Sequence, residues 1–276
     1  MADRKNQNRT AKSKTRVIQG VLLVLLALIL AVVLVRCSST RKERASIKKG
    51  IDYLHSIDSE EELAATEKVI KEQRAAAITQ LLAGEGESED GFDPWGYFSD
   101  SVILGDSRSV GFYLFDYLPQ ERVMAEPGNT IQTIDGYMDA IKSINPSYIF
   151  LCYGLNDVTS GRWDSAEAWI SEYREEVKKL HEQFPDTTVV INSILPVVEE
   201  KAVSTNERVK LVPEYAAALQ QFCETDHILY VNCDETAAEH QDMVDVDGIH
   251  YMTTFYPYWA GEMIMTAYID NEGGED

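Results

Sequence analysis

The chain has 276 residues, and its 46 Asp and Glu outnumber its 25 Lys and Arg, for a net charge of −21. The first 50 residues hold 12 Lys and Arg and 2 Asp and Glu, a net charge of +10, so the rest of the chain carries −31. So acidic a body excludes nucleic-acid binding through phosphates, which needs a basic surface, and it favours a neutral substrate.

Residues 17–35 form an apolar stretch interrupted only by Gln19 and Gly20. At about 1.5 Å per residue, a helix of this length nearly crosses a bilayer core of roughly 30 Å. The stretch therefore predicts a transmembrane anchor. A buried core helix is the alternative, but both flanks are basic. A cleaved signal peptide would have a shorter apolar region ending in small residues, whereas this one ends in Arg36-Cys37.

Six Lys and Arg precede the apolar stretch and six follow it closely, so counting positive charges does not orient the anchor. A short basic tail resists translocation, whereas a long domain crosses largely regardless of its charge. We therefore expect residues 1–16 to be a cytoplasmic tail. The chain would be a single-pass protein of the cell membrane with its main domain outside the cytoplasm.

Residues 36–90 are expected to form a helical stalk and an acidic linker. Apolar residues in 45–83 fall partly on a helical period among many Glu, Lys and Ala. The pattern breaks at 58–62, so we expect a solvated helix with at most weak self-association rather than a sustained coiled coil. Residues 84–90, Gly-Glu-Gly-Glu-Ser-Glu-Asp, have the composition of a linker.

The remaining part, residues 91–276, alternates short apolar, β-branched runs with helical patterns. Strands are expected at 101–105, 122–125, 148–153, 188–193 and 228–232, and helices at 109–118, 131–144, 165–184, 207–224 and 256–269. This alternation predicts a three-layer α/β fold whose parallel strands are covered by helices on both faces. Ligands bind beyond the carboxyl ends of such strands, so the candidate site lies just after them.

Ser107 follows the first expected strand, at a strand-to-helix turn. There a hydroxyl can project into a cleft, and free N–H groups at the start of a helix can bind a developing oxyanion. A serine that only caps the helix is the alternative. After the second strand, Gly128 can bring its N–H close to a ligand or be an ordinary loop glycine. After the third, Asn156 can donate its amide or cap the next helix.

Asp247 lies three residues before His250 near the end of the chain. At this spacing the carboxylate can bind one ring nitrogen of the imidazole and leave the other for a serine hydroxyl. An acidic surface loop with an incidental histidine is the alternative. Of the other four histidines, only His55, in the expected stalk, also has an Asp three residues before it. The order Ser, Asp, His matches one of the known orders of catalytic triads.

The four cysteines, Cys37, Cys152, Cys223 and Cys233, have no metal-ligand spacing. Cys152 lies in an apolar run and is expected in the core. Cys223 and Cys233 could pair if the fold brings them together, but sequence alone cannot establish a disulfide.

Taken together, these motifs resemble the SGNH/GDSL hydrolase superfamily over roughly residues 98–270. The matching blocks are Gly105-Asp106-Ser107, Gly128, Gly154-Leu155-Asn156-Asp157 and Asp247-Gly248-Ile249-His250. Arg108 stands where the commonest form of the first block has Leu. The resemblance implies a flavodoxin-like sheet of about five parallel strands, with no metal and no organic cofactor. It also implies a Ser107-His250-Asp247 triad, with oxyanion donors from the Ser107 and Gly128 backbones and the Asn156 side chain.

The resemblance and the expected anchor suggest a serine esterase that removes O-acyl groups, above all acetyl, from a cell-wall or surface carbohydrate or from another small ester. The step from family to substrate is an analogy. The alternatives are an O-acetyltransferase acting on such a polymer, a lipase or a thioesterase. A non-enzymatic alternative is a surface binding protein with a degenerate hydrolase fold.

Overall fold

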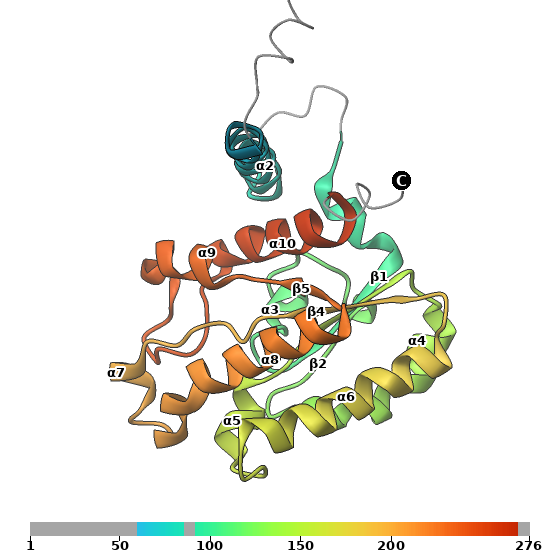
Figure 1. Ribbon diagram of the computed structural model, residues 1–276, viewed down its shortest axis with the longest axis vertical. Coiled ribbons are helices and arrows are strands. Elements are labelled where there is room, and N and C mark those ends of the chain that lie inside the picture. The colour runs from blue at the N-terminus through green and yellow to red at the C-terminus, as the bar shows by residue number, and fades with distance from the viewer. Residues whose placement is uncertain (1–59, 86–91, 270–276) are drawn as a thin grey trace, which may run out of the picture. The chain divides into compact units, whose positions relative to one another are not determined.

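The structure, a computed structural model, describes residues 60–85 and 92–269, which are drawn in colour in Figure 1. The expected cytoplasmic tail (1–16) and membrane anchor (17–35) lie outside these residues. Within the described ranges, no helix has both the length and the apolar character needed to cross a membrane.

The chain divides into two compact units, Met1–Val69 and Ile70–Asp276. The described residues of the first unit are the start of helix α2 (Glu60–Leu82), so the described part of the expected stalk is helical. The end of α2 belongs to the second unit, where Leu82 is buried and its carbonyl accepts a hydrogen bond from Trp95 Nε1 at 3.1 Å. The second unit therefore begins before residue 91, where the domain was expected to begin.

The second unit is built on one sheet of five parallel strands in the order β2-β1-β3-β4-β5. The strands are β1 (Ser101–Gly105), β2 (Val123–Ala125), β3 (Tyr148–Cys152), β4 (Thr188–Asn192) and β5 (Leu229–Val231). This is the strand order of flavodoxin-like folds. The prediction of an α/β fold with five parallel strands is confirmed.

Helices cover both faces of this sheet (Figure 1). The helices of this unit after α2 are α3 (Gly111–Leu114), α4 (Met138–Ile144), α5 (Leu155–Ser160), α6 (Ala166–Gln183), α7 (Glu199–Ala202), α8 (Val212–Asp226), α9 (Asp234–Glu239) and α10 (Tyr256–Ile264). Alternate residues of each central strand point to opposite faces. In β3, Ile149 and Leu151 join the core under α6 and α8, whereas Phe150 joins the core under α10.

Several expected helices are shorter than predicted. The helix expected over 109–118 is only α3, because the chain turns at Asp116 with φ 62° and Pro119 follows. The helix expected over 131–144 begins as a 3₁₀ helix, Ile131–Tyr137, before α4. The one expected over 207–224 begins as a 3₁₀ helix, Glu207–Leu211, before α8. The last helix ends at Ile264 and continues as one π-helical turn, Met265–Ile269.

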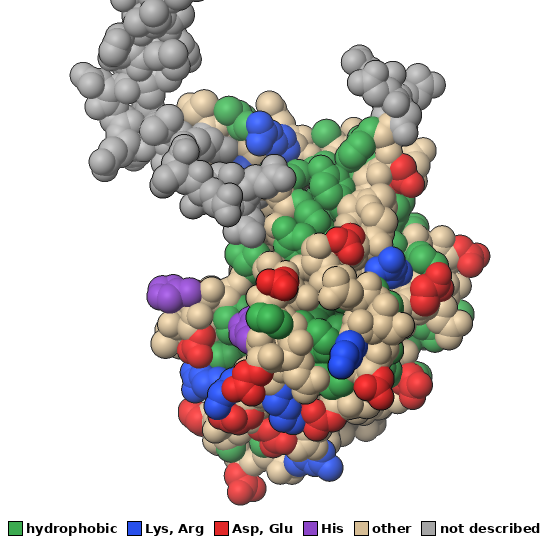
Figure 2. Space-filling model, turned by 90° about the vertical axis from the view of Figure 1, so that its right-hand side faces the viewer, with side chains coloured by type: hydrophobic (Ala, Val, Ile, Leu, Met, Phe, Trp, Pro, Cys, Tyr) green, Lys and Arg blue, Asp and Glu red, His purple; other side chains and the backbone are tan. Residues whose placement is uncertain are grey.

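Figure 2 shows the side of the molecule on which α4 ends and β1 begins, the amino-terminal edge of the sheet. Lys and Arg side chains are interspersed there among Asp and Glu, and hydrophobic side chains gather toward the top of the view. The visible part of this face therefore carries charges of both signs and is not uniformly acidic. The candidate site lies at the opposite, carboxyl edge.

Candidate active site

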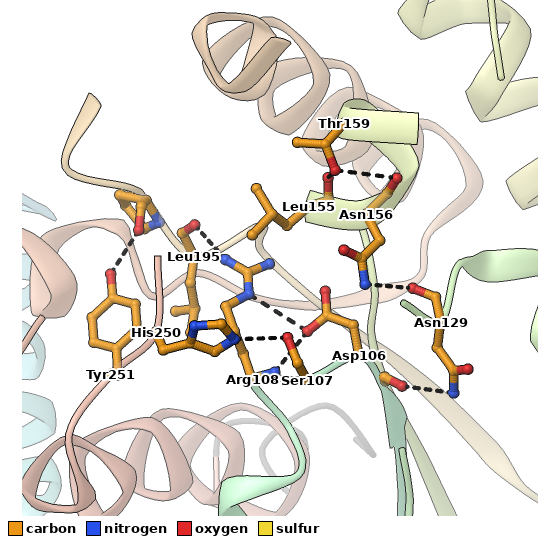
Figure 3. A network of polar contacts seen from close by, with 12 residues as sticks. Asp106, Ser107, Arg108, Asn129, Leu155, Asn156, Thr159, Leu195, His250 and Tyr251 are labelled. Atoms are coloured by element: carbon orange, nitrogen blue, oxygen red, sulfur yellow. Dashed lines mark hydrogen bonds and ion pairs between the residues drawn. The ribbon is translucent and has the colours of Figure 1, made fainter. Parts of the chain in front are cut away.

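Ser107 and His250 meet at the carboxyl edge of the sheet, although they are 143 residues apart in the chain. Ser107 lies in the turn between β1 and α3, and His250 lies in a loop shortly before α10 (Figure 3). Ser107 Oγ is 2.9 Å from His250 Nε2. On its other side, His250 Nδ1 is 2.6 Å from Asp247 Oδ2. The structure thus brings the three expected triad residues into one hydrogen-bonded line.

Asp247 is held in its orientation from two directions. Its Oδ1 accepts the backbone N–H groups of Ile249 at 2.8 Å and His250 at 3.0 Å, while Oδ2 faces the imidazole. Partial burial alone would raise the pKa of Asp247, but these hydrogen bonds outweigh it and hold the pKa below its ordinary value. The carboxylate is therefore ionised at neutral pH and accepts from Nδ1–H. This tautomer leaves Nε2 free to accept the Ser107 hydroxyl proton.

The loop that carries Asp247 and His250 is a tight turn. Asp245 N–H bonds to the His250 carbonyl at 2.8 Å, and Gly248 N–H bonds back to the Asp245 carbonyl at 3.0 Å. Gly248 has φ 76°, and a Cβ there would lie 2.8 Å from the Val198 carbonyl oxygen. Only glycine fits this turn without strain. The turn explains how a spacing of three residues points the carboxylate at its own histidine.

The three expected oxyanion donors lie at the same edge, two of them in turns and the third in a helix. The Ser107 and Gly128 backbone N–H groups make no hydrogen bond with any residue that the structure describes. Asn156, in the first turn of α5, uses one amide hydrogen of Nδ2 for the Asn129 carbonyl at 3.0 Å, which leaves the second available. No direct hydrogen bond joins Gly128 to Ser107 or Asn156 within the described ranges, so its part in the site stays a prediction.

Asn129 is a buried residue of the site that the sequence analysis missed. Its Nδ2 donates to the Gly105 carbonyl at 3.2 Å and to the Tyr137 hydroxyl at 3.0 Å. Its backbone carbonyl accepts the hydrogen bond from Asn156 Nδ2. Asn129 thereby ties the loop after β2 to β1 and α5 (Figure 3). In the sequence, Asn129 could have been noticed only because it is a polar residue directly after the expected donor Gly128.

Asp157, the residue after Asn156 in α5, has a buried carboxyl group. Its Oδ1 accepts the Ile131 N–H at 3.0 Å and the Trp169 indole N–H at 3.0 Å, whereas its buried Oδ2 has no partner. Burial raises the pKa of Asp157 to about 6, although these two hydrogen bonds oppose the rise. Asp157 thus supports the site structurally, and its carboxyl group takes up a proton in mildly acidic solution.

Cys152, Cys223 and Cys233 are buried free thiols, so the possible pairing of Cys223 with Cys233 does not occur. Among the residues that the structure describes, no three His, Cys, Asp or Glu side chains gather as metal ligands would.

The sequence model of the GDSL-like lipase/acylhydrolase family matches residues 81–256, which is more than half of the chain. The matched range contains all the residues that the sequence analysis assigned to the site. No curated protein sequence is similar enough to the chain to count as a match.

Solved structures resemble this one at low sequence identity. An acetyl xylan esterase is 18% identical, with a TM-score of 0.48 over 60% of this chain and 99% of that chain. A GDSL-like lipase from Bacteroides thetaiotaomicron VPI-5482 is 14% identical, with a TM-score of 0.48 over 61% and 87%. A lipase/acylhydrolase from Enterococcus faecalis is 15% identical, with a TM-score of 0.46 over 59% and 93%.

The raised pKa of Asp157 predicts a pH-dependent effect of Asp157→Asn. Between about pH 4 and pH 6 the folded chain keeps a proton on Asp157 that the unfolded chain has lost, so this residue's contribution to stability falls as the pH rises. The shift from 3.8 to about 6 corresponds to a loss of about 3 kcal/mol. Asn keeps the accepting oxygen and does not ionise. Relative to the wild type, the variant should therefore gain about that much between pH 4 and pH 7.

The measurement is urea unfolding of both proteins at pH 4, 5, 6 and 7. Asp186→Asn, which removes an exposed carboxylate, controls for the loss of one negative charge. A stability difference between Asp157→Asn and the wild type that stays constant over this range would contradict the prediction.

Proposed function

Because the chain belongs to the GDSL-like lipase/acylhydrolase family, we propose that this carboxylic ester hydrolase is a membrane-anchored serine esterase. It would remove O-acyl groups, above all acetyl, from a cell-wall or surface carbohydrate outside the cytoplasm. The observation that carries the proposal is the hydrogen-bonded line from Asp247 through His250 to Ser107. A serine hydroxyl on an imidazole that is itself oriented by a carboxylate is the arrangement that attacks esters.

In the first half of the reaction, Ser107 Oγ forms a bond to the ester carbonyl carbon while its proton passes to His250 Nε2. The electron pair of the carbonyl double bond moves to the oxygen. Asp247 accepts the Nδ1–H and stabilises the imidazolium cation. When the tetrahedral intermediate collapses, the bond to the alcohol oxygen breaks, and this oxygen takes the proton from His250. The acyl group stays on Ser107.

In the second half, water replaces the alcohol. His250 removes a proton from water, whose oxygen bonds to the acyl carbon, and the collapse of the second intermediate returns that proton to Ser107 Oγ. The released products are a carboxylic acid and the deacylated alcohol. A sugar hydroxyl in place of water would make the same site a transferase, so the identity of the acceptor separates the two activities.

The negative oxygen of each intermediate would be held by the Ser107 and Gly128 backbone N–H groups and the Asn156 amide. What supports this assignment is that the two backbone N–H groups have no partner among the described residues and that Asn156 has one amide hydrogen to spare. Donors left free in this way are already oriented when negative charge develops on the substrate oxygen. Such preorganised donors contribute most to the rate by stabilising that charge in the transition state.

A neutral acylated carbohydrate suits the charge of the chain. With a net charge of −31 after residue 50, the body repels acidic polymers and anionic lipid. The anchor at 17–35 and the basic tail before it support a location at the cell membrane with the catalytic domain outside.

Ser107→Ala should abolish hydrolysis of 4-nitrophenyl acetate by the full chain in detergent, with a loss of at least about 10⁴-fold in kcat, because no other group would form the acyl-enzyme. Ser171→Ala, an exposed serine on α6, is the matched control and should retain activity. A folded wild type without turnover would contradict hydrolysis and favour a transferase that requires its own acyl donor, or a binding protein.

Asn156→Ala should lower kcat about 10²–10³-fold, the usual cost of one oxyanion donor. Asn156→Asp keeps the shape of the side chain but replaces the donor with a negative charge, so its kcat should fall at least as far. Steady-state kinetics with 4-nitrophenyl acetate measure both. Wild-type turnover in Asn156→Ala would remove Asn156 from the site.

Deletion of residues 17–35 should move the protein from the membrane fraction to the soluble fraction, because no other apolar stretch of this length exists in the sequence. In intact cells that carry the full chain, an external protease should digest the catalytic domain. Its protection until the cells are opened would contradict the proposed orientation.

A further inference from the structure

One short segment contacts both halves of the candidate active site. Residues 193–198 follow β4, and we call them the β4 connector. Val198 N–H donates to the Gly248 carbonyl at 2.8 Å, and the Tyr251 hydroxyl donates to the Pro196 carbonyl at 2.9 Å. These contacts lie on either side of His250 in the sequence. The loop of the base is therefore held to the β4 connector at two points.

Arg108 makes the corresponding contact from the nucleophile side. Its Nη1 donates to the Leu195 carbonyl of the β4 connector at 2.8 Å (Figure 3). The side chain is only 4% exposed. Its own carbonyl accepts the buried Tyr256 hydroxyl at 2.7 Å, which fixes the backbone next to Ser107. Arg108 thus reaches from the residue after the nucleophile to the segment that holds the base.

Asp106, on the other side of Ser107, orients the guanidinium. Its carboxylate is 1% exposed, lies 3.6 Å from Arg108 Nε, and accepts the Arg108 backbone N–H at 3.0 Å. A guanidinium presents its donors in a rigid fork, so contacts on Nε and Nη1 together fix its plane. The positive charge of Arg108 also acts on Tyr251, the residue after His250. It lowers the pKa of the Tyr251 hydroxyl, although burial outweighs it and raises that pKa to about 12.

We propose that Arg108 is a positioning residue, which bridges the Ser107 turn to the β4 connector and so keeps Ser107 Oγ within hydrogen-bonding distance of His250 Nε2. The inference rests on the proposed serine esterase function. It assigns a role to the position at which this chain departs from the commonest first block of the family. An error of about 1 Å in the placement of reacting groups can cost about 10²-fold in rate, so such a bridge matters for turnover.

The experiment compares three variants of the full chain in detergent. Arg108→Leu removes the bridge but leaves the Asp106 carboxylate buried without its cation, which can destabilise the fold. Asp106→Asn/Arg108→Leu removes both charges while Asn keeps the oxygen that accepts the backbone N–H. Arg122→Leu is the matched control, because Arg122 is half-buried and also donates to a backbone carbonyl, that of Ser101 at the far end of β1.

For each variant we would measure kcat and KM with 4-nitrophenyl acetate, the rate at which a fluorophosphonate labels Ser107, and the thermal unfolding midpoint. We expect kcat and the labelling rate of both Arg108 variants to fall about 10–10²-fold with KM within twofold of the wild type. The double variant should be the more stable of the two. Arg122→Leu should keep kcat within twofold.

Two results would overturn the inference: wild-type kcat in folded Arg108→Leu, or recovery of both stability and kcat in the double variant, which would reduce Arg108 to a counter-charge for Asp106. If Arg108→Leu does not fold, the double variant decides alone. An inactive wild type would contradict the proposed function itself, whereas an active wild type with equally active Arg108 variants would contradict only the role of Arg108.

Discussion

The hydrogen-bond register of the parallel sheet brings Gly105 of β1 level with Ala125 of β2 and with Cys152 of β3. Because parallel strands all end at one edge, the loops that follow these three residues begin side by side. Ser107, Asn129 and Asn156 each lie within a few residues of such an end, so the backbone pairing places all three at the same edge. The two cores on either face of the sheet then hold that edge rigid.

The strands could be predicted to within a residue or so at each end, because runs such as Tyr148–Cys152 are apolar on both faces and leave few alternatives. The helices were harder to delimit. The segment Ile131–Tyr137 is 3₁₀ rather than α-helical, and its first N–H bonds to the carboxylate of Asp157 in α5, the helix after the next strand. A local pattern cannot reveal a contact between segments that meet only in the folded chain.

The same distinction applies to the site. The Asp247–His250 pair is local and Ser107 follows a clear strand, so sequence alone was enough to predict that these three side chains meet. Asn129 was missed because its importance comes from burial and from partners on three other segments. Arg108 could be noted as unusual for its position, but its partner Leu195 is 87 residues away. The raised pKa of Asp157 likewise depends on burial, which a sequence does not show.

The three buried thiols bear on the compartment in which the domain would work. A thiolate, not a thiol, reacts with oxidants and disulfides. Burial raises the pKa of Cys223 to about 12 and raises those of Cys152 and Cys233 well above their ordinary value, so almost none of each is ionised at neutral pH. These cysteines are therefore slow to oxidise or to exchange. Once folded, the domain therefore keeps these three thiols unreacted even in oxidising surroundings.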